Sequence, residues 1–137
     1  MTGISTKTIY AVAALHELSQ VQDDALLKIK EIAARANVPQ NFLEQILLEL
    51  KKQHILVSIK GAHGGYRLAK QLKDITLKDI VMALETDALS EVCRTNNPAL
   101  KLFWEDIRDG VANVFDIPLS ELKSYQQKAN DTLNYSI

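Results

Sequence analysis

The side chains best suited to chemistry are four polar residues at the start of one predicted helix: Gln40, Asn41, Glu44 and Gln45. Asparagine and glutamine pair with adenine through one donor and one acceptor, and glutamate accepts a hydrogen bond from the cytosine amine. Lys51 and Lys52, at the end of the same stretch, suit the helix dipole and could reach phosphate. These residues indicate a surface that reads bases, although a solvated polar face, common on amphipathic helices, is the alternative.

Two short amphipathic helices separated by a sharp turn would position these side chains. The first is predicted over 29–36, and the second starts at Pro39 and runs to Lys52. Asn37 tolerates the left-handed conformation that such a turn needs, and Val38 is an apolar plug within it. The expected inward residues are Ile32 and Ala33 on the first helix, and Phe42, Leu43, Ile46, Leu47 and Leu50 on the second. This spacing is typical of a helix-turn-helix.

A glycine-rich stretch directly after these helices predicts a β-hairpin. Gly61, Gly64 and Gly65 let the chain reverse between strands at 57–60 and 66–69. A phosphate cradle would need a strand that runs straight into a helix, whereas residues 66–69 alternate in polarity like a second strand. An ordinary solvated hairpin is the other interpretation, but a hairpin directly after a helix-turn-helix favours DNA binding.

Further helices are predicted on both sides of this unit. Ser5 or Thr6 would cap a first helix that carries Lys7 in its first turn and ends before residue 22. Thr76 and Asp79 form a capping-box pattern at the start of a short helix. The expected inward residues are Ile9, Val12, Ala13 and Leu18 on the first helix, and Ile80, Val81, Ala83 and Leu84 on the short one.

The widest apolar stripe lies in the C-terminal part of the chain. Pro98 suits the start of a long helix that runs through Phe115. Its apolar residues recur at steps of three and four: Leu100, Phe103, Trp104, Ile107, Val111, Val114 and Phe115. This stripe could close the chain's own core, and residues 118–130 would add a short helical stretch with Leu119 and Leu122 inward.

Composition and charge are those of an ordinary soluble domain. The 137 residues suit one domain with a real core, and no apolar run reaches the length of a membrane span. The N-terminus lacks the residue order of a signal peptide, so we expect a cytoplasmic protein with no membrane partner. Residues 1–70 carry nine Lys/Arg against six Asp/Glu, and residues 71–137 carry seven against eleven. The small basic excess of the first half gives weak support for contact with phosphates.

Catalytic patterns are missing from the sequence. His16, His54 and His63 are scattered over different segments, and no Ser-His-Asp order, paired-carboxylate motif or nucleotide loop is recognisable. We therefore expect that the protein is not an enzyme.

Several segments together resemble one family: Ser5-Thr6-Lys7 with Tyr10-Ala11, Phe42-Leu43-Glu44-Gln45-Ile46, the stretch Lys60-Gly61-Ala62-His63-Gly64-Gly65-Tyr66-Arg67-Leu68, and Ile75-Thr76-Leu77-Lys78-Asp79-Ile80. From about Ile4 to Leu122 the chain resembles the bacterial Rrf-type family of winged helix-turn-helix transcription regulators. The resemblance implies a mainly α fold with a small β-hairpin and a long C-terminal dimerisation helix. Residues 1–75 would form the DNA-binding region, and residues 76–137 would hold the connector, the long helix and the tail.

The resemblance also implies a partner and a set of contacts. The protein would be a homodimer on double-stranded DNA, with a recognition helix in each major groove and the hairpin, or wing, in the adjacent minor groove. The residues assigned to DNA are Lys7, Pro39, Gln40, Asn41, Glu44, Gln45, Lys51, Lys60, Gly61, His63, Gly64 and Arg67. Those assigned to dimerisation are Leu100, Phe103, Trp104, Ile107, Val111 and Val114. His63 departs from the small residues often found at the tip of the family's wing.

A polar connector over 87–97 contains the chain's single cysteine, Cys93. Relatives that bind an iron–sulfur cluster have three cysteines in this region, and such a cluster needs four good ligands, mostly thiolates. One cysteine argues against a cluster, so we expect no cofactor and no metal, and an intramolecular disulfide is excluded. Cys93 is either an inert residue or a redox sensor, because Arg94 favours the thiolate while Glu91 opposes it.

The predicted function is therefore a DNA-binding transcriptional regulator, a repressor by our interpretation. The chain looks most like the members without the full set of cluster cysteines, which admits a partner enzyme as co-regulator. The alternatives are a protein-interaction module built on a helix-turn-helix scaffold, or a redox or iron–sulfur sensor that uses Cys93.

Overall fold

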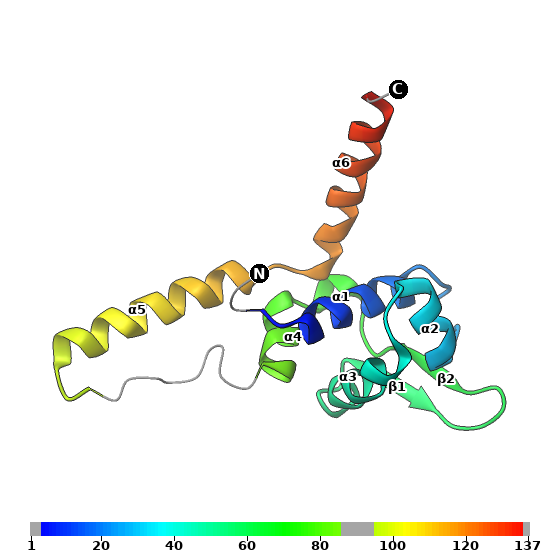
Figure 1. Cartoon of the computed structure of the whole chain (residues 1–137), viewed down its shortest axis with the longest axis horizontal. Helices are drawn as coiled ribbons and strands as arrows, with labels where there is room; N and C mark the ends of the chain where they lie inside the picture. Colours follow the sequence, from blue (N-terminus) through cyan, green and yellow to red (C-terminus); the bar gives the residue numbers. More distant parts are fainter. Residues whose placement is uncertain (1–3, 86–94, 136–137) are drawn as a thin grey trace.

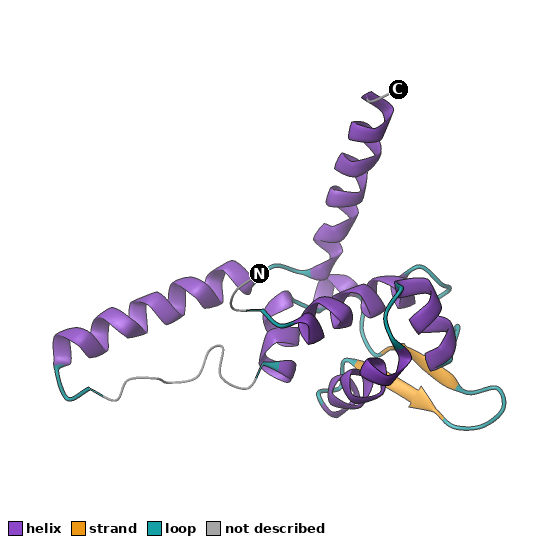
Figure 2. Cartoon of the chain, in the orientation of Figure 1, coloured by secondary structure: helices purple, strands orange, loops and turns teal. Residues whose placement is uncertain are grey.

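The computed structural model describes residues 4–85 and 95–135 and is mainly helical, with one small hairpin (Figures 1 and 2). The elements follow in the order α1 (Thr6–Ser19), α2 (Ile29–Ala36), α3 (Gln40–Lys52), β1 (Leu56–Ile59), β2 (Gly65–Leu68), α4 (Leu77–Leu84), α5 (Pro98–Phe115) and α6 (Leu122–Tyr135). Short 3₁₀ turns, Leu72–Asp74 and Leu119–Glu121, precede α4 and α6. The predicted fold class is confirmed.

One hydrophobic core joins the first four helices to the hairpin. Its members include Ala11, Ala14, Leu15 and Leu18 of α1, Ile32 of α2, Leu43, Ile46, Leu47 and Leu50 of α3, Leu56 of β1, and Ile80 and Leu84 of α4. Short apolar stripes from separate helices meet here, so the removal of apolar surface from water holds the bundle together.

The buried face of α1 differs from the predicted one. Ile9 is 47% exposed, whereas Thr8 is 1% exposed and turns toward the core. The middle of this helix contains Ala11, Ala13 and Ala14, whose small side chains give a weak pattern, so tertiary packing decides the rotational phase of the helix. The assignment of Ile9 to the core is therefore wrong.

The turn between α2 and α3 has the geometry that the sequence predicts. Asn37 adopts a left-handed conformation with φ 55°, and Val38 is buried. The N–H of Val38 donates to the carbonyl of Ala33 at 3.0 Å, which closes the end of α2. Pro39 stands at the N-cap of α3, so the helix itself begins one residue later than expected.

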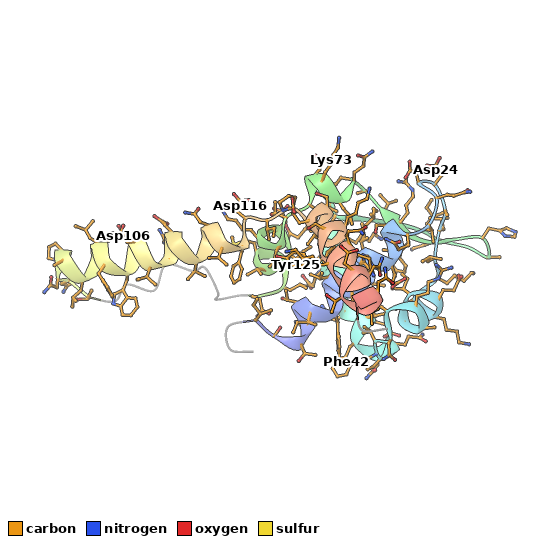
Figure 3. The ribbon with its side chains drawn as sticks, turned by 90° about the horizontal axis from the view of Figure 1, so that it is seen from above. Asp24, Phe42, Lys73, Asp106, Asp116 and Tyr125 are labelled. Atoms are coloured by element: carbon orange, nitrogen blue, oxygen red, sulfur yellow. The ribbon has the colours of Figure 1, made fainter. Side chains whose placement is uncertain are left out.

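Phe42 is the main error among the expected core residues of α3. Its side chain is 56% exposed, and its ring lies 6.0 Å from that of Tyr10, at an interplanar angle of 54°. The buried residues of α3 gather around Leu43, and neighbours along a helix differ in direction by about 100°. Phe42 consequently lies at the edge of the buried face, and its side chain is seen at the surface in Figure 3.

The hairpin pairs β1 with β2 in antiparallel register, from Leu56 opposite Leu68 to Ile59 opposite Gly65. Both strands are shifted by one residue from the predicted ranges. Tyr66 also exchanges two backbone hydrogen bonds with Leu27, at 2.8 and 3.0 Å, which ties the hairpin to the segment before α2. Gly65 has φ 153°, and a Cβ there would lie 2.7 Å from the carbonyl oxygen of Leu27. The close approach of these two backbones therefore requires glycine at position 65.

The last two helices leave the core in different directions (Figure 1). Asn97 caps α5 by accepting from the N–H groups of Ala99, at 2.9 Å, and Leu100, at 3.4 Å. No residue of α5 is buried, so the interpretation that its stripe closes the chain's own core is wrong. Leu119 is buried before α6, as expected, but α6 continues to Tyr135. None of the helices in the described ranges is both long and apolar enough for a membrane crossing.

A carboxylate at the end of α4 holds the start of α1. The backbone N–H of Ser5 and the hydroxyl of Thr8 each donate to Glu85 Oε1 at 2.8 Å, and the Ser5 hydroxyl donates to the same atom. The Ser5 hydroxyl lowers the pKa of Glu85 most, partial burial opposes it, and the Ser5 N–H, Thr8 and the charge of Lys7 lower the pKa further. The negative charge also lies at the positive end of α1, whose first turn contains no acidic residue.

The turn at Gly64 gives a prediction about stability. A Cβ at Gly64 would lie 2.0 Å from the carbonyl oxygen of Ile59, and both groups belong to the backbone. Gly64→Ala should lower the free energy of unfolding by about 1–3 kcal/mol, measured by urea denaturation. Gly110→Ala is the matched control, since nothing lies within 4 Å of a Cβ there and alanine favours a helix. Equal stability of the two variants would contradict this account of the turn.

The Glu85 contact predicts a pH-dependent stability. Because the pKa of Glu85 is lowered on folding, its contribution is present above the unfolded carboxyl pKa, about 4.3, and is lost as the pH falls through the folded value. Glu85→Gln should cost about 1–2 kcal/mol of unfolding free energy at pH 7, because a charged acceptor becomes neutral. The difference from wild type should shrink below pH 4.3. Asp106→Asn, on the exposed surface of α5, is the control. A loss that does not change with pH would exclude the carboxylate as its cause.

Candidate DNA interface

The outward face of α3 is fixed by the burial of its opposite face. Leu43, Ile46, Leu47 and Leu50 are all buried. The four side chains predicted to read bases, Gln40, Asn41, Glu44 and Gln45, are all exposed, as are Lys51 and Lys52. With about 100° between successive residues, Asn41, Gln45 and Lys52 project most directly away from the core. The helix therefore presents amide and ammonium groups to the outside in a defined order.

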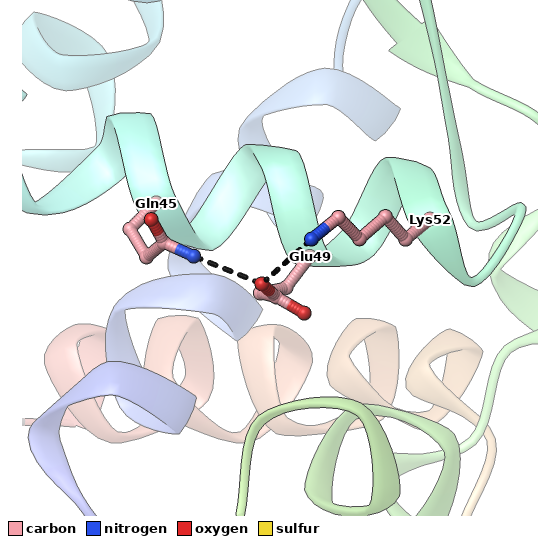
Figure 4. Close-up of polar contacts among 3 residues, drawn as sticks. All are labelled: Gln45, Glu49 and Lys52. Carbon is pink, nitrogen blue, oxygen red and sulfur yellow. Dashed lines mark hydrogen bonds and ion pairs between the residues drawn. The ribbon is translucent and has the colours of Figure 1, made fainter.

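Three residues along this helix form a chain of polar contacts (Figure 4). Gln45 Nε2 donates to Glu49 Oε1 at 2.9 Å, and Lys52 Nζ lies 3.5 Å from the same oxygen. The side chain of Glu49 is 27% exposed. Sequence reasoning missed Glu49, although its spacing from Gln45 and Lys52 was a usable signal, because residues three and four apart share a helix face.

The wing loop presents exposed groups on a turn that is held in place. Lys60, Gly61 and His63 are exposed, while Gly64 is buried within the turn, where its N–H donates to the carbonyl of Gly61 at 3.0 Å. Lys28 Nζ donates to the carbonyl of Ala62 at 2.8 Å, so this lysine fastens the loop to the start of α2. Lys28 is a second residue that sequence reasoning missed, because its partner lies 34 positions away in the chain.

Arg67 and Lys7, like Lys51 on α3, lie apart from the wing loop. Arg67 is half-buried in β2, and its Nη1 lies 3.4 Å from the carbonyl oxygen of Leu68. It lines a hollow of about 770 Å³ that also involves His16 and the start of α6. Lys7 is exposed in the first turn of α1, and Pro39 is exposed at the N-cap of α3. The structure thus places Lys60 and His63 on the loop but not Arg67.

The residues assigned to dimerisation form an exposed apolar stripe along α5. Leu100, Phe103, Trp104, Ile107, Val111 and Val114 are between 40% and 73% exposed. The rings of Phe103 and Trp104 lie 5.1 Å apart in an edge-to-face arrangement. Exposed apolar patches of this kind are typical of interaction surfaces.

The described residues do not fit a metal centre. Within residues 4–85 and 95–135, no three His, Cys, Asp or Glu side chains gather where they could hold an ion. Cys93 and most of the polar connector lie outside the described residues. The chain has no second cysteine to complete a thiolate ligand set.

Comparison with known proteins gives the same picture along almost the whole chain. The family model described as Rrf2, iron-dependent transcriptional regulator, matches residues 4–122. The HTH-type transcriptional regulator CymR of Bacillus subtilis is 36% identical over 124 residues, which cover 89% of this chain and 90% of CymR. The solved structure of CymR, the global cysteine regulator of B. subtilis, matches with a TM-score of 0.74 and 35% identity over 91% of this chain and 98% of that chain.

A second solved structure, T. potens IscR, has a TM-score of 0.72 and 30% identity, and covers 92% of this chain and 89% of its own. These relatives are regulators of transcription and not enzymes, and they share the helix-turn-helix, the hairpin and the helices that follow. The resemblance found in the sequence motifs is confirmed, and the chain belongs to the Rrf2 family of transcriptional regulators.

Proposed function

We propose that this regulator is a cytoplasmic homodimeric repressor that binds an inverted-repeat operator. The observation that carries the proposal is the polar face of α3, whose exposed amides lie opposite four buried apolar residues. Each subunit would place α3 in a major groove and the wing in the adjacent minor groove. A dimer bound across a promoter would block access to it, and for this reason we assign repression.

The contacts follow from the chemistry of each exposed group. Asn41 and Gln45 would pair with adenine, and Glu44 would accept from a cytosine amine. Lys7, Lys51 and Lys60 would contact phosphates, which position the protein without reading sequence. Residues 1–75 would thus form the DNA-binding region of the proposal, and residues 76–137 would form the part that pairs two subunits.

The exposed stripe of α5 supports the dimer. Most helical stability in proteins comes from packing of an apolar face rather than from helix propensity. In the described residues no side chain of this stripe is buried within its own subunit, so we assign it to the same helix of a second copy. Two helices that pair along these stripes would remove both apolar faces from water.

The proposed function assigns no role to iron. The family description mentions iron, but the donor set of this chain does not fit a cluster of thiolate ligands. Cys93 stays a proposed redox sensor in the alternative reading, and a partner enzyme stays a proposed co-regulator. A protein-interaction module without DNA binding is the competing function, and the first experiment below separates it from the proposal.

The DNA-binding prediction is tested on genomic fragments selected by the purified protein. On a selected operator, fluorescence anisotropy should show that Lys60→Ala weakens binding and lowers the slope of log K against log salt by about one. Asn41→Ala should cost about 1–3 kcal/mol of discrimination at one base pair. Lys128→Ala, on α6, should change neither quantity. Retention of no fragment at low salt, with stable capture of a protein partner, would support the competing function.

The dimer prediction concerns Ile107 at the centre of the α5 stripe. Ile107→Asp would bury a charge between the subunits and should raise the dimer dissociation constant at least about tenfold, measured by analytical ultracentrifugation. Trp104 fluorescence should shift toward the emission of a solvated indole. Asn113→Asp adds the same charge on another side of α5 and should leave the dimer intact. If Ile107→Asp remained dimeric, the subunit interface would have to lie elsewhere.

A further inference from the structure

Glu49 lies between two groups of the recognition helix and makes contact with both. Its Oε1 accepts from Gln45 Nε2 at 2.9 Å and lies 3.5 Å from Lys52 Nζ (Figure 4). All three residues belong to α3, one turn apart, so the contacts are set by the helix itself. One N–H of the Gln45 amide is therefore already hydrogen-bonded within the helix before any other partner approaches.

The contact selects one orientation of the Gln45 amide. The two ends of a glutamine amide have nearly the same shape, but an ionised carboxylate can only accept hydrogen bonds. Glu49 therefore takes an N–H of Gln45 and excludes the orientation in which the carbonyl oxygen of Gln45 would face it. One N–H and the carbonyl oxygen of Gln45 are left for another partner.

The remaining groups match one base better than its main competitor. Adenine presents an acceptor, N7, and a donor, the N6 amine, in the major groove, so it needs one donor and one acceptor from the protein. Guanine presents two acceptors, N7 and O6, which are best met by two donors. Because one N–H of Gln45 is already used by Glu49, the amide can complete the adenine pair but not two separate bonds to guanine.

Lys52 offsets the negative charge of the Glu49 carboxylate on this face of α3. An unpaired negative charge on a helix that approaches phosphates would be repelled by the DNA. Lys52 Nζ offsets that charge at 3.5 Å and remains mostly exposed, with 59% of its side chain accessible.

We propose that Glu49 is a positioning residue that presets Gln45 for adenine and against guanine. This inference rests on the proposed function, since it assumes that α3 reads bases. It adds a residue that need not touch DNA, and it predicts that selectivity at one base pair depends on a carboxylate behind the reading side chain.

The test uses the full-length protein, a selected operator and a scan of single base-pair substitutions. Gln45→Ala identifies the base pair that Gln45 reads. At that pair, Glu49→Ala should reduce the preference for adenine over guanine by about tenfold and leave the penalties at other pairs unchanged. Glu49→Gln, whose carbonyl oxygen can still accept from Gln45, should restore part of the preference. Glu49→Ala combined with Gln45→Ala should show no further loss beyond Gln45→Ala alone.

A second measurement needs no DNA. In the free protein, the Gln45 amide proton that is hydrogen-bonded to Glu49 should resonate downfield of its position in Glu49→Ala, because a hydrogen bond to a carboxylate deshields the proton. Glu44→Ala, on another side of α3, should not change this shift. Unchanged amide shifts, or an unchanged preference at the Gln45 base pair, would overturn the positioning role while DNA binding stood. Absence of any selected operator, with the shifts as expected, would instead remove the proposed function and with it the role of the contact in base reading.

Discussion

The burial of one face of α3 is the constraint on which the rest of the molecule depends. Leu43, Leu47 and Leu50 are fully buried, and each such side chain contributes about 1.5–3 kcal/mol relative to exposure. Rotation of α3 about its axis would expose them, so the core sets the rotational phase of the helix. The same phase decides that Asn41 and Gln45 face outward. The positions of the side chains at the candidate interface are thus fixed by the packed side of the helix. A binding site is held most precisely when it lies on a rigid element supported in this way.

The wing depends on the same core through its backbone. The two hydrogen bonds between Leu27 and Tyr66 join β2 to the chain just before α2, and Lys28 fastens the loop at Ala62. The hairpin would otherwise be a two-stranded sheet of marginal stability. These contacts tie the wing to the segment that precedes α2 and to the start of α2 itself. An extended loop can then hold a fixed position relative to α3 although few of its own side chains are buried.

Local signals carried most of what the sequence could predict. Asn37 and Val38 marked the turn, Thr76 and Asp79 marked the start of α4, and Pro98 marked the start of α5, because each acts through neighbours a few residues away. The errors fell where the pattern was ambiguous. Alanines in α1 did not define a face, and Phe42 was assigned to the core by residue type although its position puts it at the edge of the buried stripe.

Contacts between distant segments were beyond the sequence for a different reason. Glu85 reaches Ser5 across 80 positions, and Lys28 reaches Ala62 across 34, through polar groups that follow no period. A single chain gives no signal for such pairs. Glu49 is an intermediate case, because its spacing of four residues from Gln45 is visible in the sequence, but such a spacing alone does not show that two side chains are hydrogen-bonded.

Glu85 connects the start of α1 with the part of the chain that leads to α5. This residue ends α4, accepts three hydrogen bonds at the start of α1, and is followed along the chain by the connector that leads to α5. The start of α1 carries Lys7, one of the proposed phosphate contacts, and α5 carries the exposed stripe. The proposed DNA-binding region and the helix proposed to pair two subunits are therefore joined by a stretch of chain whose first residue, Glu85, is held by hydrogen bonds at the start of α1.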